Sequence, residues 1–365
     1  MSWGNPQSSQ EKLLCGLMSP LSLGYGIGSY FRLAAYSQGY VKRVRLPIPV
    51  VSIGNITCGG TGKTPMAIDV TRRLIAAGYK VAVLSRGYAR KSKQKVTVVS
   101  NGKGEFAMCE EAGDEPLLIA LSVPEAIVIV GSSRVETAAL AIEEYQADAI
   151  VLDDGFQHIR LERDLDVILI DYNDDPENDT LLPAGRLREP LTALNRAKVV
   201  VITKVPPNPD EERLESLRTQ IRKYAERAEI VAARFVPKRL RTSTGEAPLT
   251  QLKGQRVVAF CGVARPEGFA ATLDLRSRRW PEAIAGAGLI ADFPTGEPQV
   301  LNSEKQSLIL GAIGSIGKFH QLRIDPLDRN EKEIGRVVLR KALLGAALDI
   351  AELEAPAHAN PTIPP

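Results

Sequence analysis

Short apolar runs alternate with stretches of helical spacing along most of the chain between Ile48 and Ala233. Most of the runs are apolar throughout, which is typical of strands covered on both faces. The pattern predicts strands at 48–53, 80–84, 95–99, 126–130, 149–152, 167–170, 199–202 and 230–233, and helices at 65–77, 115–122, 134–145 and 211–227. Buried strands that alternate with helices indicate an α/β fold with a mainly parallel sheet.

Breaks in this pattern divide the chain into segments. The sequence PPNP at 206–209 interrupts the alternation, and a further buried strand is predicted at 255–261. A length of 365 residues also favours two domains. We expect an N-terminal segment at 1–46, a core at 47–205, a C-terminal domain at 206–350 and a proline-rich, frayed tail at 351–365.

The N-terminal segment has no charged residue between Leu13 and Phe31, nearly the length of a membrane span. Several Gly and Ser residues keep its hydrophobicity modest. From Pro20 onward, helical spacing places on one face Leu23, Ile27, Tyr30, Phe31 and Ala34. Basic residues accompany and follow this stripe: Arg32, Lys42, Arg43 and Arg45. The pattern suits a helix lying in an anionic membrane surface, and it equally suits a helix packed on its own domain.

Composition narrows the function classes. The 46 Lys and Arg against 43 Asp and Glu give a net charge of +3, too near balance to indicate a nucleic-acid partner. The 4 cysteines are scattered and only 3 histidines occur, so neither a disulfide framework nor a zinc site is expected. A reducing compartment fits this cysteine usage.

A glycine-rich loop is the most specific motif. The sequence IGNITCGGTGKT joins a predicted strand to a predicted helix. Its candidate ATP-binding residues are Thr57, Cys58, Gly59, Gly60, Thr61, Gly62, Lys63 and Thr64. In a P-loop, backbone amides and the helix N-terminus surround phosphates, the lysine reaches the β- and γ-phosphates, and the hydroxyl ligates Mg²⁺. Thr57 stands where the usual pattern has glycine, and an ordinary glycine turn is the alternative.

Two adjacent carboxylates, Asp153 and Asp154, follow the predicted strand at 149–152. Ligands of parallel sheets gather at the carboxyl ends of strands, where a P-loop enzyme needs a carboxylate beside its metal. Adjacent residues point in different directions, so we expect one of them to bind Mg²⁺ and the other to act on the nucleophile or support the metal site. Turn chemistry or helix capping is the alternative, because Asp-Asp-Gly is a common turn sequence.

Other charged residues lie beside predicted strand ends. Asp114 and Glu115 form a second acidic cluster, in which Asp114 could equally be a helix N-cap. Arg86 follows the strand at 80–84, and Arg134 opens the helix after the strand at 126–130. Each arginine could contact phosphate or form a surface salt bridge.

Five blocks together resemble the tetraacyldisaccharide 4'-kinases, the lipid A 4'-kinases. They occur in that family's order as VSIGNITCGGTGKTP, LSRGYAR, GDEP, VLDDGFQH with RDLDVILID, and LLPAGRLREPL. The resemblance covers roughly residues 20–268, and a P-loop without its leading glycine is a feature of this family. It implies a P-loop core with a smaller C-terminal α/β domain, ATP and Mg²⁺ bound between them, and an N-terminal helix attached to the cytoplasmic face of the inner membrane.

The implied reaction transfers the γ-phosphoryl group of ATP to the 4'-hydroxyl of a tetraacylated glucosamine disaccharide 1-phosphate. By resemblance, Asp114 accepts the proton of the sugar hydroxyl, mainly orienting the nucleophile, with Lys63 and Asp154 as further catalytic residues. Mg²⁺ is expected on Thr64 together with a carboxylate from Asp153, Asp154 or Glu115. The candidates for contact with substrate or phosphate are Arg86, Arg134, His158, Arg186 and Arg188. We expect a monomer with no nucleic-acid partner.

The resemblance stops after Phe269. The family has an Asp-His motif in its C-terminal domain, and the nearest echoes here are Asp292-Phe293-Pro294 and His320. A catalytically impaired homologue of the kinase is therefore one alternative function. A membrane-associated P-loop ATPase switch is another, although such proteins often carry an additional lysine early in the loop and residues 57–61 contain none.

Overall fold

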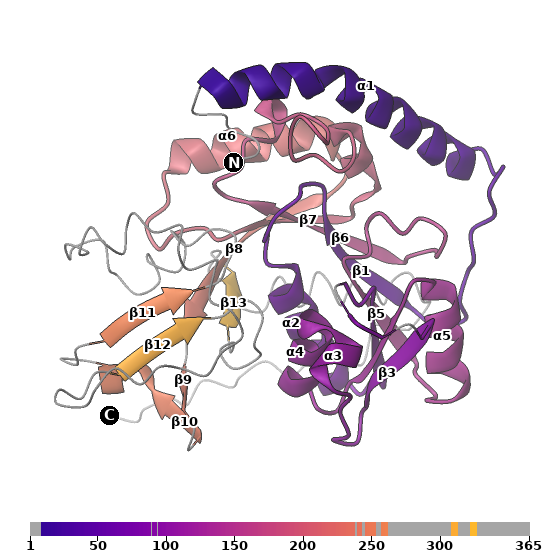
Figure 1. Ribbon diagram of the computed structural model, residues 1–365, viewed down its shortest axis with the longest axis vertical. Coiled ribbons are helices and arrows are strands. Elements are labelled where there is room, and N and C mark those ends of the chain that lie inside the picture. Colours follow the sequence, from indigo (N-terminus) through magenta and orange to yellow (C-terminus); the bar gives the residue numbers. More distant parts are fainter. Residues whose placement is uncertain are drawn as a thin grey trace, which may run out of the picture.

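A nine-stranded sheet forms the centre of the computed structural model, which describes residues 9–88, 90–92, 94–237, 239–242, 245–252, 257–261, 308–312 and 322–326. In the order β13-β8-β7-β6-β1-β5-β2-β4-β3, only the edge strands β13 and β3 run antiparallel to their neighbours. The strands are β1 (Val50–Asn55), β2 (Val81–Ser85), β3 (Val96–Asn101), β4 (Ile127–Gly131), β5 (Ala149–Asp153), β6 (Leu165–Asp171), β7 (Val199–Thr203), β8 (Glu229–Pro237) and β13 (Leu322–Pro326). The expected α/β fold with a mainly parallel sheet is confirmed (Figure 1).

Helices connect and cover these strands. They are α1 (Ser9–Ser37), α2 (Lys63–Ala76), α3 (Cys109–Ala112), α4 (Asp114–Ser122), α5 (Arg134–Glu143) and α6 (Glu211–Tyr224), with short 3₁₀ turns η1 (Pro176–Asn178), η2 (Leu191–Arg196) and η3 (Leu249–Leu252). Two small sheets pair β9 (Arg239–Thr242) with β10 (Gly245–Pro248) and β11 (Val257–Cys261) with β12 (Leu308–Ala312).

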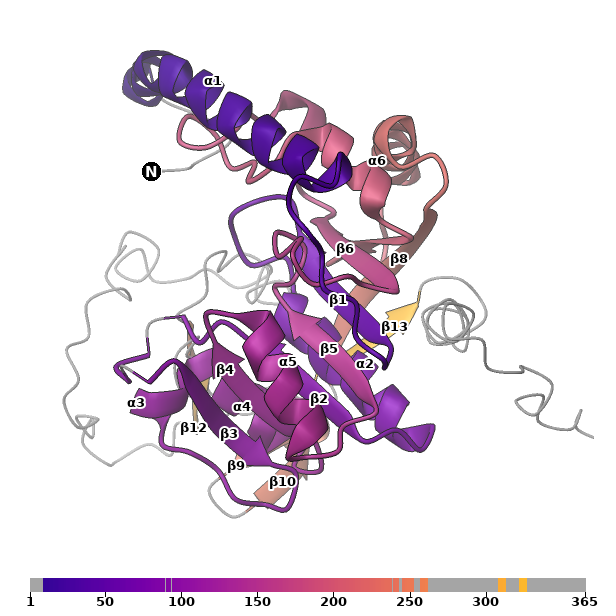
Figure 2. The ribbon, with the colours of Figure 1, turned by 90° about the vertical axis from the view of Figure 1, so that its right-hand side faces the viewer.

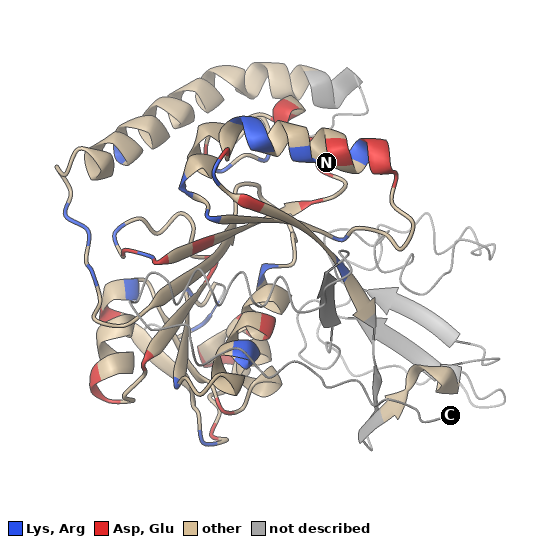
Figure 3. Cartoon of the chain, turned by 180° about the vertical axis from the view of Figure 1, so that it is seen from behind, with Lys and Arg blue, Asp and Glu red and all other residues tan. Residues whose placement is uncertain are grey.

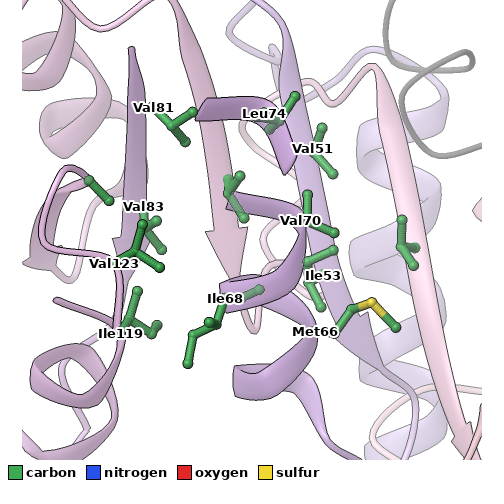
Figure 4. Close-up of a cluster of buried hydrophobic side chains, with 14 of the residues drawn as sticks. Val51, Ile53, Met66, Ile68, Val70, Leu74, Val81, Val83, Ile119 and Val123 are labelled. Atoms are coloured by element: carbon green, nitrogen blue, oxygen red, sulfur yellow. The ribbon is translucent and has the colours of Figure 1, made fainter. Parts of the chain in front are cut away.

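Both faces of the large sheet are buried, which explains strands that are apolar throughout. Val51 and Ile53 of β1 pack with Met66 and Val70 of α2 in one cluster, to which α4 also contributes (Figure 4). The alternate residue Val50 belongs to a cluster on the opposite face with residues of α5. A third cluster joins β6 and β7 to α6. Successive side chains of a strand point to opposite faces, so burial of both faces requires apolar residues at every position.

The sheet continues past the domain boundary expected at residue 205. The chain leaves β7, forms α6 and returns as β8, which pairs parallel with β7. Asp210 begins α6 by accepting a hydrogen bond from the backbone N–H of Arg213 at 3.2 Å. The prolines at 206–209 therefore mark a loop between elements of one sheet. The pair β11 and β12, predicted in part as the strand at 255–261, forms a separate parallel sheet.

Helix α1 lies along the outside of the molecule, on the side of α6, in both Figure 1 and Figure 2. It passes through Pro20 as one helix, and Figure 3 shows few charged residues along it. Its exposed large side chains are Leu13, Leu17, Leu21, Leu23, Tyr25, Ile27, Tyr30 and Phe31. Four of the five residues of the expected stripe thus face away from the protein, while Ala34 is half-buried. No helix in the described ranges is both long and apolar enough to cross a bilayer.

Gly54, near the carboxyl end of β1, allows the turn after β5 to pack directly on this central strand. A Cβ atom at Gly54 would lie 2.5 Å from Cβ and 2.9 Å from the backbone nitrogen of Phe156. We expect Gly54→Ala to lower the free energy of unfolding by about 1–3 kcal/mol, measured by urea denaturation, because the backbone must move. Gly28→Ala in α1, where nothing lies within 4 Å, is the control and should cause no loss.

Candidate functional site

The loop at residues 56–62 joins the end of β1 to the start of α2. Gly59 and Gly62 have positive φ angles of 128° and 91°, a backbone conformation that favours glycine. A Cβ at Gly62 would also lie 2.4 Å from Cζ of Phe235 in β8. Thr57 is buried, whereas the segment from Cys58 to Gly60 is exposed. The loop is thus anchored at both ends with an open middle, and its shape depends on its glycines.

Side chains from neighbouring strand ends hold this loop. Asn55 donates a hydrogen bond from Nδ2 to Oγ1 of Thr61 at 3.0 Å, and Thr203 donates from its hydroxyl to the Thr61 carbonyl at 2.8 Å. Lys204, directly after β7, donates to the carbonyl of Gly60. Asn55, Thr203 and Lys204 were not among the predicted site residues. Their positions at the carboxyl ends of buried strands were the available signal.

Asp153, the last residue of β5, is only 1% exposed. Burial, reinforced by the negative charges of Glu115 and Asp154, raises the pKa of its carboxyl to about 7, although Lys63 and Arg134 oppose the shift. Its Oδ1 atom has no hydrogen-bond partner within the described chain. A buried carboxylate oxygen without a partner is costly, so this side chain is suited to bind a proton or a cation.

Asp154 has the opposite environment. Its carboxylate accepts two hydrogen bonds from Arg188, at 2.7 Å and 3.1 Å, and lies 3.9 Å from Nζ of Lys63. Burial raises its pKa, but the hydrogen bond from Arg188 and the charge of Lys63 outweigh this effect and lower it. Arg188 also donates to Oε1 of Gln157 at 3.1 Å and contacts Oδ1 of Asn55 at 3.3 Å. The lysine of the glycine-rich loop and one carboxylate at the end of β5 are thus neighbours.

Arg186, expected beside Arg188 as a contact for substrate or phosphate, has a different environment. Its Nη1 donates to Asp174 at 2.8 Å and its Nε donates to Asp179 at 2.9 Å. Both carboxylates are buried, with side chains 2% and 1% exposed. The backbone carbonyl of Arg186 accepts a hydrogen bond from the N–H of Cys58 at 2.7 Å. These contacts favour a structural role in which Arg186 fixes its own segment against the glycine-rich loop.

The remaining candidates for phosphate contact differ in exposure. Arg134 is 3% exposed and donates to the carbonyl of Gly131 at 2.8 Å, so the alternative of a surface salt bridge is wrong. Burial lowers its pKa to about 10, which still leaves it charged at neutral pH. Arg86 is exposed. Burial and the surrounding arginines, Arg134 first, lower the pKa of His158 to about 4, so this imidazole is neutral and can meet phosphate only as a neutral group.

Asp114 is the first residue of α4. Gly113 occupies the N-cap position and no side chain caps the helix there, so the alternative of Asp114 as N-cap is wrong. Asp114 is exposed, and its Oδ1 accepts a hydrogen bond from the thiol of Cys109 at 3.0 Å. That bond is the main cause that raises the pKa of Cys109 to about 11, which keeps the thiol protonated. Asp114 therefore presents a carboxylate to solvent from the start of a helix.

Together these groups can bind a phosphorylated ligand. The exposed loop amides, the N-terminus of α2 and Lys63 supply positive potential beside the carboxylates of β5. Within the described residues, no three His, Cys, Asp or Glu side chains converge into a metal cage. Asp292, Phe293, Pro294 and His320 lie outside the described residues.

Comparison with known proteins decides the family. A model of the tetraacyldisaccharide-1-P 4'-kinase family matches residues 14–280. The chain belongs to this family. It is 40% identical over 339 residues to the tetraacyldisaccharide 4'-kinase of Anaeromyxobacter sp. (strain K), covering 89% of this chain and 87% of that one. It is 39% identical over 272 residues to the enzyme of Pelobacter propionicus, covering 73% and 72%.

A solved member of the tetraacyldisaccharide 4'-kinase family has a similar fold. The structure of LpxK from Aquifex aeolicus, described as an "apo" form in complex with ATP, superimposes with a TM-score of 0.65 at 28% sequence identity. The match covers 90% of this chain and 99% of that one. The sequence resemblance to the tetraacyldisaccharide 4'-kinases is thereby confirmed.

The raised pKa of Asp153 predicts a stability that depends on pH. A carboxyl whose pKa is raised in the folded state stabilises that state while protonated, and the contribution is lost as pH rises toward 7. Without Mg²⁺ or nucleotide, the free energy of unfolding of the wild type should fall by about 2–3 kcal/mol between pH 5 and pH 8 from this carboxyl. Asp153→Asn should not show this fall, because its amide does not titrate. Urea unfolding at both pH values measures this difference. Asp154→Asn, which removes the partner of Arg188, should lose stability at both; an equal response of the two variants would contradict the assignment.

Proposed function

We propose that this chain transfers the γ-phosphoryl group of ATP to the 4'-hydroxyl of a tetraacylated disaccharide 1-phosphate in lipid A biosynthesis. The observation that carries the proposal is the juxtaposition of Lys63 with Asp154 and Arg188, at the carboxyl edge of the parallel sheet. The family of the chain and the ATP complex of its structural relative support the same reaction.

The glycine-rich loop acts in this proposal as a P-loop. Its backbone amides and the N-terminus of α2 would bind the phosphates of ATP, because unpaired N–H groups and the helix dipole favour negative charge there. Lys63 would contact the β- and γ-phosphates, and its distance of 3.9 Å from Asp154 keeps it at the carboxylate end of β5. Charge that develops during phosphoryl transfer is thus stabilised by groups already in place.

Thr64, Asp153 and Glu115 fit a Mg²⁺ ion that accompanies ATP. The partnerless Oδ1 of Asp153 is the orphaned oxygen that a cation would satisfy, and the charge of Glu115 acts on the same carboxyl. The bound ion would neutralise charge on the phosphate oxygens during transfer. Asp154, already paired with Arg188, is better suited to orient Lys63 than to bind the metal.

Asp114 would accept the proton of the acceptor hydroxyl. A carboxylate is a weak base for an alcohol, so its main role is to orient the nucleophile while the γ-phosphoryl group moves through a loose transition state. The thiol of Cys109 restricts one carboxylate oxygen through its hydrogen bond, which leaves the other oxygen for the substrate.

Two variants test the kinase with labelled ATP and the disaccharide 1-phosphate in detergent micelles. Lys63→Ala should lower kcat at least about 100-fold because it removes charge stabilisation, and Asp114→Asn should lower it about 100-fold because it removes the orienting carboxylate. Lys80→Ala and Glu125→Gln change exposed residues and are the controls. ATP hydrolysis without labelled lipid would instead indicate a nucleotide switch, and the absence of both activities would indicate a catalytically impaired homologue.

We also propose that α1 attaches the enzyme to the cytoplasmic face of the inner membrane. Its apolar side chains project outward, and the exposed Lys42 and Arg43 follow it. Arg32 and Arg45 are engaged within the protein, since Arg32 donates to the Gln157 carbonyl and Arg45 pairs with Asp164 at 2.6 Å. An outward apolar helix followed by basic residues matches an anionic lipid surface, where the acylated substrate is found.

Vesicle binding tests this attachment. Replacing Leu23, Ile27 and Phe31 together with serine should reduce co-sedimentation with phosphatidylglycerol-containing vesicles at least about tenfold, because about 1.5–3 kcal/mol of apolar transfer energy is lost per fully buried side chain. Met108→Ser is the control, because Met108 is 73% exposed and precedes α3, away from α1. Equal binding by the triple variant and the wild type would exclude α1 as the attachment.

A further inference from the structure

The inward side of α1 fits closely against the segment at residues 181–188. Ser22 donates a hydrogen bond to the carbonyl of Leu181 at 2.9 Å and accepts one from the backbone N–H of Ala184 at 3.0 Å. One turn later, a Cβ at Gly26 would lie 2.9 Å from Cδ1 of Leu181. Small residues therefore let the helix approach this segment, and hydrogen bonds fix where it lies.

Two further hydrogen bonds from α1 reach residues of the candidate active site. The hydroxyl of Tyr25 donates to the backbone carbonyl of Arg188 at 2.8 Å. The guanidinium of Arg32 donates to the backbone carbonyl of Gln157. Tyr25 and Arg32 are seven positions apart, two helical turns, so both side chains lie on the same side of the helix.

Arg188 and Gln157 contact each other and the groups proposed to handle ATP. Arg188 holds both oxygens of Asp154, and its Nη1 also donates to Oε1 of Gln157 at 3.1 Å. Gln157 donates from Nε2 to the carbonyl of Asn55 at 2.9 Å, at the start of the glycine-rich loop. The backbone N–H of Arg188 donates to the carbonyl of Ile56 at 2.7 Å. Only one residue, Arg188, therefore separates the hydroxyl of Tyr25 from the carboxylate of Asp154.

We propose that Tyr25 and Arg32 are positioning residues for phosphoryl transfer, which hold Arg188 and Gln157 so that Asp154 is correctly oriented beside Lys63. The proposal rests on the kinase function proposed above. Helix α1 then has two separable roles, because its outward residues bind lipid and its inward residues organise the site. Loss of an inward hydrogen bond lowers turnover even where no membrane attachment is needed.

Steady-state kinetics in detergent micelles tests this positioning role. Tyr25→Phe and Arg32→Gln should each lower kcat about fivefold, the effect of one lost hydrogen bond, with little change in KM for the lipid or in vesicle binding. The matched controls are Tyr40→Phe and Arg222→Gln, at exposed positions with no side-chain hydrogen bond in the described structure. Wild-type kcat in both test variants, or a change confined to KM, would overturn the proposal.

Hydrogen–deuterium exchange provides a readout independent of catalysis. In the unliganded full-length protein, Tyr25→Phe and Arg32→Gln should speed amide exchange in residues 153–158 and 181–188, while both controls leave it unchanged. Unchanged exchange in both segments would overturn the positioning role. A different result would separate this proposal from the kinase function. If the two variants exchange faster but the wild-type protein forms no phosphorylated lipid, the link from α1 to Asp154 is supported and the kinase function is contradicted.

Discussion

The paired hydrogen bonds between Arg188 and Asp154 join the parts of the site into one unit. Asp154 belongs to the turn after β5, while the backbone of Arg188 is bonded to Ile56 at the entrance of the glycine-rich loop. The side chains remain 28% and 33% exposed, so the pair contributes more through its two-point geometry than through its energy. The pair thereby adds a side-chain link between the loop and the turn, beside the hydrogen bond from Gln157 to Asn55 and the packing of Phe156 on Gly54.

Two adjacent carboxylates acquire different properties from this arrangement. Asp154 is kept ionised by its pairing, whereas burial makes Asp153 hold a proton up to about pH 7 unless a cation replaces it. The two consecutive residues are thereby suited to different partners, Asp154 to cationic side chains and Asp153 to a proton or a cation. The parallel sheet makes it possible, because the end of β5 directs one side chain into the protein and the next into the turn.

Much of the fold could be predicted from the sequence because strands buried on both faces, such as Ala149–Asp153, leave an unambiguous apolar signature. The loop from Thr57 to Thr64 could also be located, since glycine and lysine at that spacing have a specific physical use. The partners of charged residues could not be predicted. Arg186 and Arg188 stand two positions apart in the sequence, yet one is held by Asp174 and Asp179 and the other by Asp154. Local patterns report burial, and pairing is decided by the packing of distant segments.

The continuity of the sheet beyond residue 205 escaped prediction for a similar reason. Consecutive prolines in a sequence mark an interruption of regular structure, but they do not reveal whether the chain returns to the same sheet. Here β8 returns beside β7, and its residue Phe235 packs against Gly62 of the glycine-rich loop. A segment assigned to a second domain because of these prolines thereby contributes to the shape of the glycine-rich loop.

Helix α1 reverses the usual arrangement of an amphipathic helix, with Ser22 and Gly26 against the protein and large apolar side chains such as Leu23, Ile27 and Phe31 toward the outside. In plain aqueous buffer this surface would be covered only by contact with other molecules of the same kind. Concentrated preparations should therefore self-associate unless an amphiphile is present. A detergent in the storage buffer would cover these side chains and prevent the association.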